Sequence, residues 1–114
     1  MLSKPYIIAE MSGNHNQSLE RALQIAQAAI DCGVDALKLQ TARPDHITLD
    51  SDGKDFVIND AKSLWNGQRL YDLYKKTYTP WEWHEPIMNF CKSKGIDCFS
   101  SPFDLGAVDF LEKL

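Results

Sequence analysis

The first forty residues place a short apolar stretch, an amphipathic stretch and a second short apolar stretch in succession, and this order constrains the fold most strongly. Residues 6–11 are rich in β-branched and aromatic side chains and run into Ser-Gly-Asn, which is typical of a strand that ends in a turn. Residues 18–32 carry apolar side chains at helical spacing, between Ser18 as N-cap and Gly33 as stop signal. Residues 35–41 form the next strand. Such a strand–helix–strand crossover calls for parallel strands.

The middle of the chain, residues 42–68, is polar and rich in Asp, Asn, Ser and Gly. A loop of this length inside a compact domain is usually functional or disordered, and this one leaves room for a short hairpin. A short helix is predicted over residues 69–77, because Leu70, Leu73 and Tyr74 share one face.

A further helix is predicted to begin at Thr79 and to end before Gly95. Thr79 and Glu82 have the spacing of a capping box, and Pro80 would occupy the first helical position. Pro86 would then lie in the helix interior, where proline removes a hydrogen bond and clashes with the preceding turn, so we expect a kink or break there.

The C-terminal part repeats the strand-then-helix pattern. Residues 96–100 are predicted to form a third strand, and Asp104 is predicted to cap a last helix. Helices therefore alternate with short strands along the chain, which favours an α/β fold with a parallel sheet.

Composition excludes several classes of function. The chain has 114 residues, of which 44% are hydrophobic and 25% charged, as in soluble globular proteins. A net charge of −4 provides no basic surface for nucleic acid or for a membrane. No apolar run could span a bilayer, and the N-terminus lacks the apolar segment of a signal peptide. We therefore expect a cytoplasmic protein with neither nucleic acid nor membrane as a partner.

The three cysteines, Cys32, Cys91 and Cys98, lack the CxxC spacing of a zinc or redox motif. They are predicted to be thiols packed inside the protein in a reducing compartment.

Polar side chains lie at the end of each predicted strand. Glu10 ends the first strand, and the alternation of the second places Lys38 and Gln40 on the face opposite the leucines. The third strand ends in Ser100 and Ser101. The carboxyl ends of parallel strands form the edge where α/β folds hold their active sites. A lysine on an inner face is costly unless an anion compensates it, so the pattern indicates an enzyme that handles an anionic, phosphorylated ligand.

A purely structural interpretation stays open for each of these residues. Glu10 would then cap a loop, and Lys38 would reach solvent or pair with a structural acid. Their coincidence at matching strand ends favours function. His15 is interpreted as a hydrogen-bonding group that lines the site, because no partner at metal-ligand spacing lies near it.

The other histidines and the tryptophans give weaker signals. His84 is predicted to lie on a helix surface, and His46, in the long loop, is uninformative. The tryptophans are predicted to pack rather than to stack on a ligand: Trp65, Trp81 and Trp83.

Four segments, IAEMSGNHNQSLERA, ALKLQT, TPWEWH and FSSPFD, together resemble the N-terminal part of the sialic acid synthase family. IAE-x-x-x-NH, K-x-Q and S-[ST]-PF are shared across that family. SGNHNQSLERA, ITLDSD and TPWEWH are most similar to its pseudaminic acid synthase branch. The resemblance extends from Pro5 to Leu114.

The resemblance implies a fold and a domain arrangement. Residues 1–114 are expected to be the incomplete N-terminal part, about three βα units, of a (β/α)8 TIM barrel, with the remaining units and a C-terminal antifreeze-like domain absent. The isolated chain is therefore expected to be inactive. The full-length parent is expected to be a homodimer that uses a divalent metal, Mn²⁺ or Mg²⁺, whose ligands lie beyond this chain.

The resemblance also implies an activity. The family condenses phosphoenolpyruvate with an amino-sugar aldehyde and water, giving a nine-carbon 2-keto acid and phosphate. In the pseudaminic branch the sugar is 2,4-diacetamido-2,4,6-trideoxyaltrose. The resemblance assigns a catalytic role to Glu10 and substrate-binding roles to five further residues: Lys38, Gln40, Ser101, Asn14 and His15.

Within these roles, Lys38 and Ser101 match phosphoenolpyruvate ligands, whereas Gln40 matches a residue beside the sugar. The loop over residues 42–68 is expected to cover the sugar, with Trp65 or Asn66 nearest it.

Two alternatives stay open. The parent could be an N-acetylneuraminate or legionaminate synthase, against which TPWEWH and SGNHNQS argue. The chain could instead be a non-catalytic truncated form that associates with itself or with another protein, because three strands leave one sheet edge open and apolar interior rows exposed.

Overall fold

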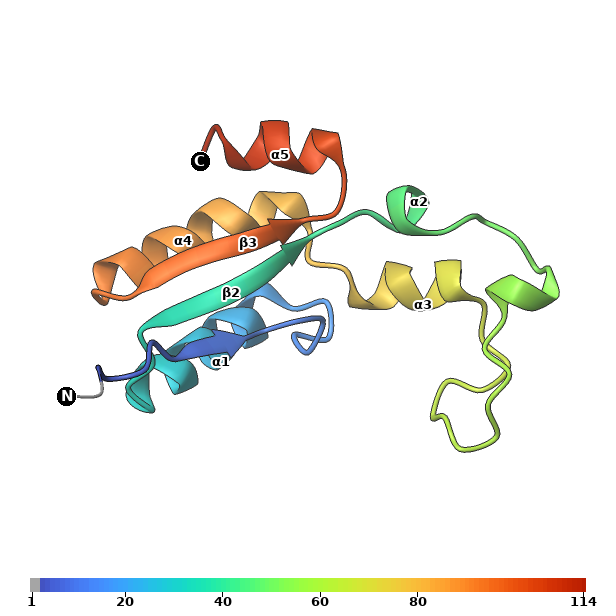
Figure 1. Ribbon diagram of the computed structural model, residues 1–114, viewed down its shortest axis with the longest axis horizontal. Coiled ribbons are helices and arrows are strands. Elements are labelled where there is room, and N and C mark those ends of the chain that lie inside the picture. Colours follow the sequence, from blue (N-terminus) through green and yellow to red (C-terminus); the bar gives the residue numbers. More distant parts are fainter. Residues whose placement is uncertain (1–2) are drawn as a thin grey trace.

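Three parallel strands form one sheet in the computed structural model, which describes residues 3–114 (Figure 1). β1 spans Ile8–Glu10, β2 spans Ala36–Thr41 and β3 spans Asp97–Pro102, with β2 in the middle. Both pairings are parallel, which confirms the predicted α/β arrangement. β3 continues past its predicted end, because Ser101 and Pro102 still pair with β2.

The helices predicted over residues 18–32, over residues 69–77 and after Asp104 are confirmed, whereas a further short helix lies in the segment predicted to be a loop. The helices are α1 (Leu19–Asp31), α2 (Pro44–Ile47), α3 (Leu70–Thr77), α4 (His84–Ser93) and α5 (Leu105–Leu111). Both predicted N-caps are confirmed: the Ser18 hydroxyl accepts from the Arg21 N–H at 3.2 Å, and the Asp104 carboxylate accepts from the Ala107 N–H at 2.8 Å. Each cap satisfies a backbone donor that would otherwise lack a partner.

The hydrophobic core lies between the sheet and two helices, α1 and α4, which pack side by side against one face of it (Figure 1). Leu37 and Leu39 of β2 point into this core and are fully buried, as their alternation predicted. The buried cluster comprises Met11, Ala22, Ala26, Leu37, Leu39, Ile87 and Cys91. Burial of this apolar surface fixes which face of the sheet receives helices.

The opposite face of the sheet has no helix over it in the described part of the chain. Lys38 and Gln40 lie on this face, and the strand register aligns them with Phe99 and Ser101 of β3. Ile8 and Phe99 leave 47% and 40% of their surface exposed. Within residues 3–114, the outer edges of β1 and β3 both lack a strand partner. The sheet therefore has two open edges, whereas the sequence predicted one.

The helix predicted from Thr79 begins later than expected, so that prediction is wrong at its start. Residues Trp81–Trp83 form a 3-10 turn, and α4 begins at His84. Pro86 therefore falls in the first turn of α4, where an N–H has no helical partner to lose. The 3-10 turn leads directly into α4, which continues through Pro86, so the kink or break expected there is wrong. Thr79 caps no helix, because its hydroxyl contacts His15 instead.

His84 is fully buried, which contradicts its predicted place on a helix surface. Its Nδ1 lies 3.1 Å from the Trp81 carbonyl oxygen and therefore carries the proton. Its Nε2 accepts from the Thr41 hydroxyl at 2.7 Å, and Thr41 in turn lies 2.6 Å from the Ser100 hydroxyl. This chain of hydrogen bonds ties the start of α4 to the carboxyl ends of β2 and β3.

The cysteines behave differently from one another. Cys91 and Cys98 pack in or against the core, as predicted. Cys32 is exposed, which contradicts the prediction, because the C-cap of α1 that it forms faces solvent.

The segment 42–68 projects beyond the carboxyl end of the sheet (Figure 1). The radius of gyration is 16.1 Å, whereas a compact domain of this length has about 13 Å. An antiparallel bridge joins Val57 to Arg69, and Ile58 exchanges backbone hydrogen bonds of 2.8 and 2.9 Å with Gly67 and Gln68. The short hairpin that the sequence allowed in this segment is therefore present as a brief antiparallel pairing near its end.

The stability of the chain is expected to fall as the pH is lowered from 7.5 to 5.5. Burial lowers the pKa of both His15 and His84 below the ordinary 6.5, so the unfolded chain binds more protons in this range than the folded chain. Urea unfolding followed by circular dichroism measures the effect. The paired carboxyls of Asp72 and Asp104 have lowered pKa values and lose their contribution only at more acidic pH.

His84→Gln is the variant that separates this cause from others. It is expected to be less stable overall and to show a shallower dependence on pH. If the free energy of unfolding fell equally steeply with decreasing pH in both proteins, His84 would not be a cause of the pH dependence.

Candidate functional site

Side chains from all three strands meet at the carboxyl end of the uncovered face. The Glu10 carboxylate lies 3.0 Å from the Lys38 ammonium, and that ammonium donates to the Ser101 hydroxyl at 3.5 Å. The register explains the meeting, because Glu10 pairs with Lys38 and Gln40 pairs with Ser101. The predicted convergence of Glu10, Lys38 and Ser101 at one edge is therefore confirmed.

The ion pair in this cluster remains able to receive a ligand. The side chains of Glu10 and Lys38 each keep 33% of their surface exposed, so solvent screens their attraction. An ammonium has about three N–H donors, of which Glu10 and Ser101 take one each. The remaining donor and the Ser101 hydroxyl provide two groups that can bind an anionic oxygen.

A pocket of about 520 Å³ adjoins the cluster on the side of Gln40. Its wall is mixed: Gln40, His46 and Thr79 are polar, and Ile47, Tyr74 and Phe103 supply apolar surface. This size and this mixture suit a small ligand that has both polar and apolar groups. The structure thus places Gln40 beside the ion pair and on the wall of a ligand-sized space.

His15 is fully buried behind this pocket rather than on its surface. Its Nδ1 accepts from the Gln17 N–H at 3.2 Å, so its Nε2 carries the proton and donates to Thr79 at 3.0 Å. His15 therefore holds Thr79, which lines the pocket. Asn14 is exposed, and its side chain donates to the Met11 carbonyl at 3.0 Å. The substrate-binding roles assigned to Asn14 and His15 stay predictions.

The loop after β1 depends on a close approach that the sequence analysis missed. A Cβ atom at Gly13 would lie 2.5 Å from the Thr77 carbonyl oxygen, so only glycine lets the end of α3 dock here. Three other residues of the loop, Ser12, Asn16 and Gln17, have positive φ angles. Such strain of about 1–3 kcal/mol per residue persists only where the surroundings impose it, often at functional sites.

His46 is a second residue whose place the sequence did not reveal. Its Nδ1 lies 2.8 Å from the carboxylate of Asp104, which also caps α5. The contact with His46, together with the Ala107 N–H, holds the pKa of Asp104 below its ordinary value. The pair fastens α2 to the turn before α5 and so shapes one wall of the pocket.

No three His, Cys, Asp or Glu side chains gather in a metal-binding arrangement within residues 3–114. The helices of this part of the chain are also too short or too polar to cross a membrane.

Residues 25–114 match the model of the NeuB family. The chain belongs to the NeuB family. Over 110 residues it is 48% identical to the pseudaminic acid synthase of Campylobacter jejuni subsp. jejuni serotype O:2, and over 114 residues it is 41% identical to that of Helicobacter pylori. These alignments cover 96% and 100% of the chain. The resemblance noted in the sequence is therefore confirmed.

A solved structure shows the same fold as this NeuB-family chain. It is the N-acetylneuraminic acid synthetase of Leptospira borgpetersenii serovar Hardjo-bovis, which aligns over 95% of the chain with a TM-score of 0.73 and 22% identity. The chain spans about a third of the length of these relatives, 32% of the Campylobacter protein and 33% of the Helicobacter protein.

Lys38→Met is expected to change the free energy of unfolding by less than about 1 kcal/mol, because exposed ion pairs contribute that little. Urea unfolding at pH 7 measures it, and Lys54→Met, on an exposed lysine of segment 42–68, is the matched control. A loss of several kcal/mol in Lys38→Met alone would show that Lys38 is a structural residue.

Proposed function

We propose that this chain supplies the first three βα units of a pseudaminic acid synthase. The enzyme would condense phosphoenolpyruvate with 2,4-diacetamido-2,4,6-trideoxyaltrose and water, releasing pseudaminic acid and inorganic phosphate. The observation that carries the proposal is the convergence of Glu10, Lys38 and Ser101 on one strand edge. Identities of 48% and 41% to pseudaminic acid synthases, against 32% to a diacetyllegionaminic acid synthase of Legionella pneumophila, favour this branch.

Lys38 and Ser101 are proposed to hold the anionic groups of phosphoenolpyruvate. The ammonium neutralises part of the negative charge, and charge-assisted hydrogen bonds fix the orientation of the molecule. Binding then competes with Glu10 for the lysine, so Glu10 becomes free to act on protons. Gln40 borders the adjoining pocket, which is proposed to receive the sugar.

The proposed reaction forms one carbon–carbon bond. The methylene carbon of phosphoenolpyruvate attacks the sugar aldehyde, whose oxygen takes up a proton. Water adds to the resulting cationic carbon and loses a proton, and phosphate leaves with cleavage of its bond to that carbon. Glu10 is proposed to orient the water and to accept its proton.

The divalent metal implied by the resemblance finds no matching set of ligands among the described residues. The proposed reaction therefore assigns no step to the metal. The metal, the homodimer of the full-length parent and the cytoplasmic location stay predictions.

The proposed barrel also accounts for the uncovered face of the sheet. Ile8 and Phe99 would face the interior of a closed barrel, and the free edges of β1 and β3 would pair with further strands. The alternative of a non-catalytic chain that associates through the same surfaces predicts no turnover in any context.

A chimera tests the proposal. Residues 5–114 replace the aligned third of the Campylobacter jejuni synthase, and phosphate release is measured with phosphoenolpyruvate and the altrose sugar. Turnover is expected. Glu10→Gln is expected to reduce it by at least about 100-fold, because it removes a general base while keeping the size of the side chain. Glu20→Gln, at an exposed position in the first turn of α1, is the matched control.

Circular dichroism establishes that each protein is folded. A folded chimera that releases no phosphate would contradict the proposal. Release with N-acetylmannosamine in place of the altrose sugar would assign the chain to another branch of the family.

A further inference from the structure

Trp65 lies at the surface, on a turn whose backbone is fixed by hydrogen bonds. Its side chain keeps 49% of its surface exposed, which contradicts its predicted packing. The Trp65 N–H donates to the Ser63 hydroxyl at 3.2 Å, and the Asp60 N–H donates to the Asn66 side chain at 3.1 Å. Gly67, at φ +82°, closes the turn. The turn that carries the exposed indole is therefore held by its own hydrogen bonds.

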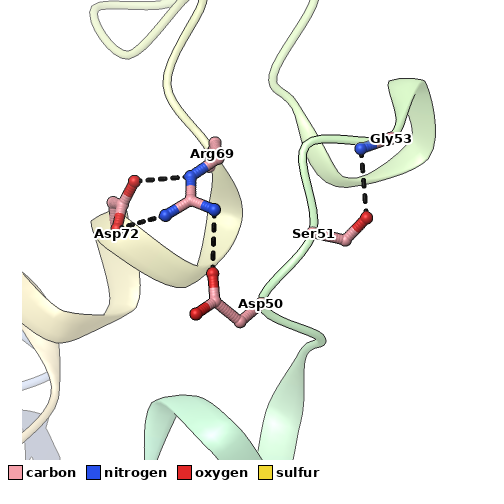
Figure 2. Close-up of polar contacts among 5 residues, drawn as sticks. All are labelled: Asp50, Ser51, Gly53, Arg69 and Asp72. Carbon is pink, nitrogen blue, oxygen red and sulfur yellow. Dashed lines mark hydrogen bonds and ion pairs between the residues drawn. The ribbon is translucent and has the colours of Figure 1, made fainter.

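Arg69 anchors this turn to the body of the protein (Figure 2). Its guanidinium binds the Asp72 carboxylate through two N–H groups at 2.7 and 3.0 Å, and a third N–H reaches Asp50 at 2.8 Å. Asp72 lies on α3, whereas Asp50 lies within the projecting segment, so one side chain joins that segment to the start of α3.

A pocket of about 270 Å³ lies between Trp65 and the loop after β1. Besides the indole, its wall contains three carboxamide side chains and one cation: Asn14, Asn16, Gln68 and Lys76. No carboxylate lines it. Lys76 is exposed and forms no ion pair within residues 3–114, where the ion pairs of the chain involve other residues.

The combination matches one class of ligand. An aromatic face packs against the apolar face of a sugar ring, carboxamides both donate to and accept from hydroxyl and acetamido groups, and an ammonium attracts a carboxylate. We propose that this pocket binds an N-acetylated acidic sugar, with its ring on Trp65 and its carboxylate at Lys76.

The position of the pocket relates it to the candidate site. Gly13 and Thr77 line both this pocket and the one beside Gln40, so the two spaces lie on either side of the contact between those residues. If the proposed function holds, on which this part of the inference rests, the acidic sugar is the product of the reaction. The Trp65 pocket is then a second subsite, next to the catalytic one, that holds product.

Calorimetric titration of the chimera tests the inference with two probes, N-acetylneuraminic acid and its uncharged methyl ester. The acid is expected to bind, and Trp65→Ala and Lys76→Gln are each expected to weaken it by about fivefold, since an exposed contact of this kind contributes up to roughly 1 kcal/mol. The ester is expected to bind as weakly as the acid binds to Lys76→Gln. Leu64→Ala and Lys54→Gln, at exposed positions outside the pocket, are matched controls.

Unchanged affinity in both Trp65→Ala and Lys76→Gln would overturn the inference. So would loss of binding in Lys38→Met alone, because the probe would then occupy the catalytic subsite. Phosphate release is measured separately. Turnover without binding at Trp65 rejects this inference and leaves the proposed function standing. Binding at Trp65 without turnover rejects the proposed function and leaves the binding of an acidic sugar standing.

Discussion

The parallel pairing of β2 with both of its neighbours is the constraint on which the rest of the structure depends. Because paired residues of parallel strands share a face, this register aligns Glu10 with Lys38 and Gln40 with Ser101. The same alternation sends Leu37 and Leu39 into the core under α1 and α4. One register therefore separates a face that stabilises the fold from a face that holds chemistry.

Two buried histidines stabilise the loops around that chemistry. His84 joins the start of α4 to Thr41, and His15 joins the loop after β1 to Thr79. Buried polar groups of this kind are stable only when each of their atoms has a partner, and no buried side-chain nitrogen or oxygen of the described residues lacks one. The loops that border the site are thus held by buried hydrogen bonds whose groups are all satisfied.

Local signals in the sequence predicted much of this arrangement. Ser18 and Asp104 were recognisable as caps, and the alternation around Lys38 predicted its face. The features that the sequence concealed depend on contacts between distant residues: His84 meets Thr41 across 43 positions, and His46 meets Asp104 across 58. No local pattern encodes such contacts. Gly13 was recognised as part of a turn, whereas its actual role is to admit the Thr77 carbonyl.

The affinity of the chimera for phosphoenolpyruvate, measured by calorimetry with and without Lys38, tests the central claim most directly. The account predicts that replacing Lys38 by methionine weakens binding by about tenfold or more, since a hydrogen bond to a charged group contributes about 1.5–3 kcal/mol. Replacing the exposed Lys54 should leave the affinity unchanged. Equal affinity with and without Lys38 would contradict the claim that the three strand ends form an anion-binding site.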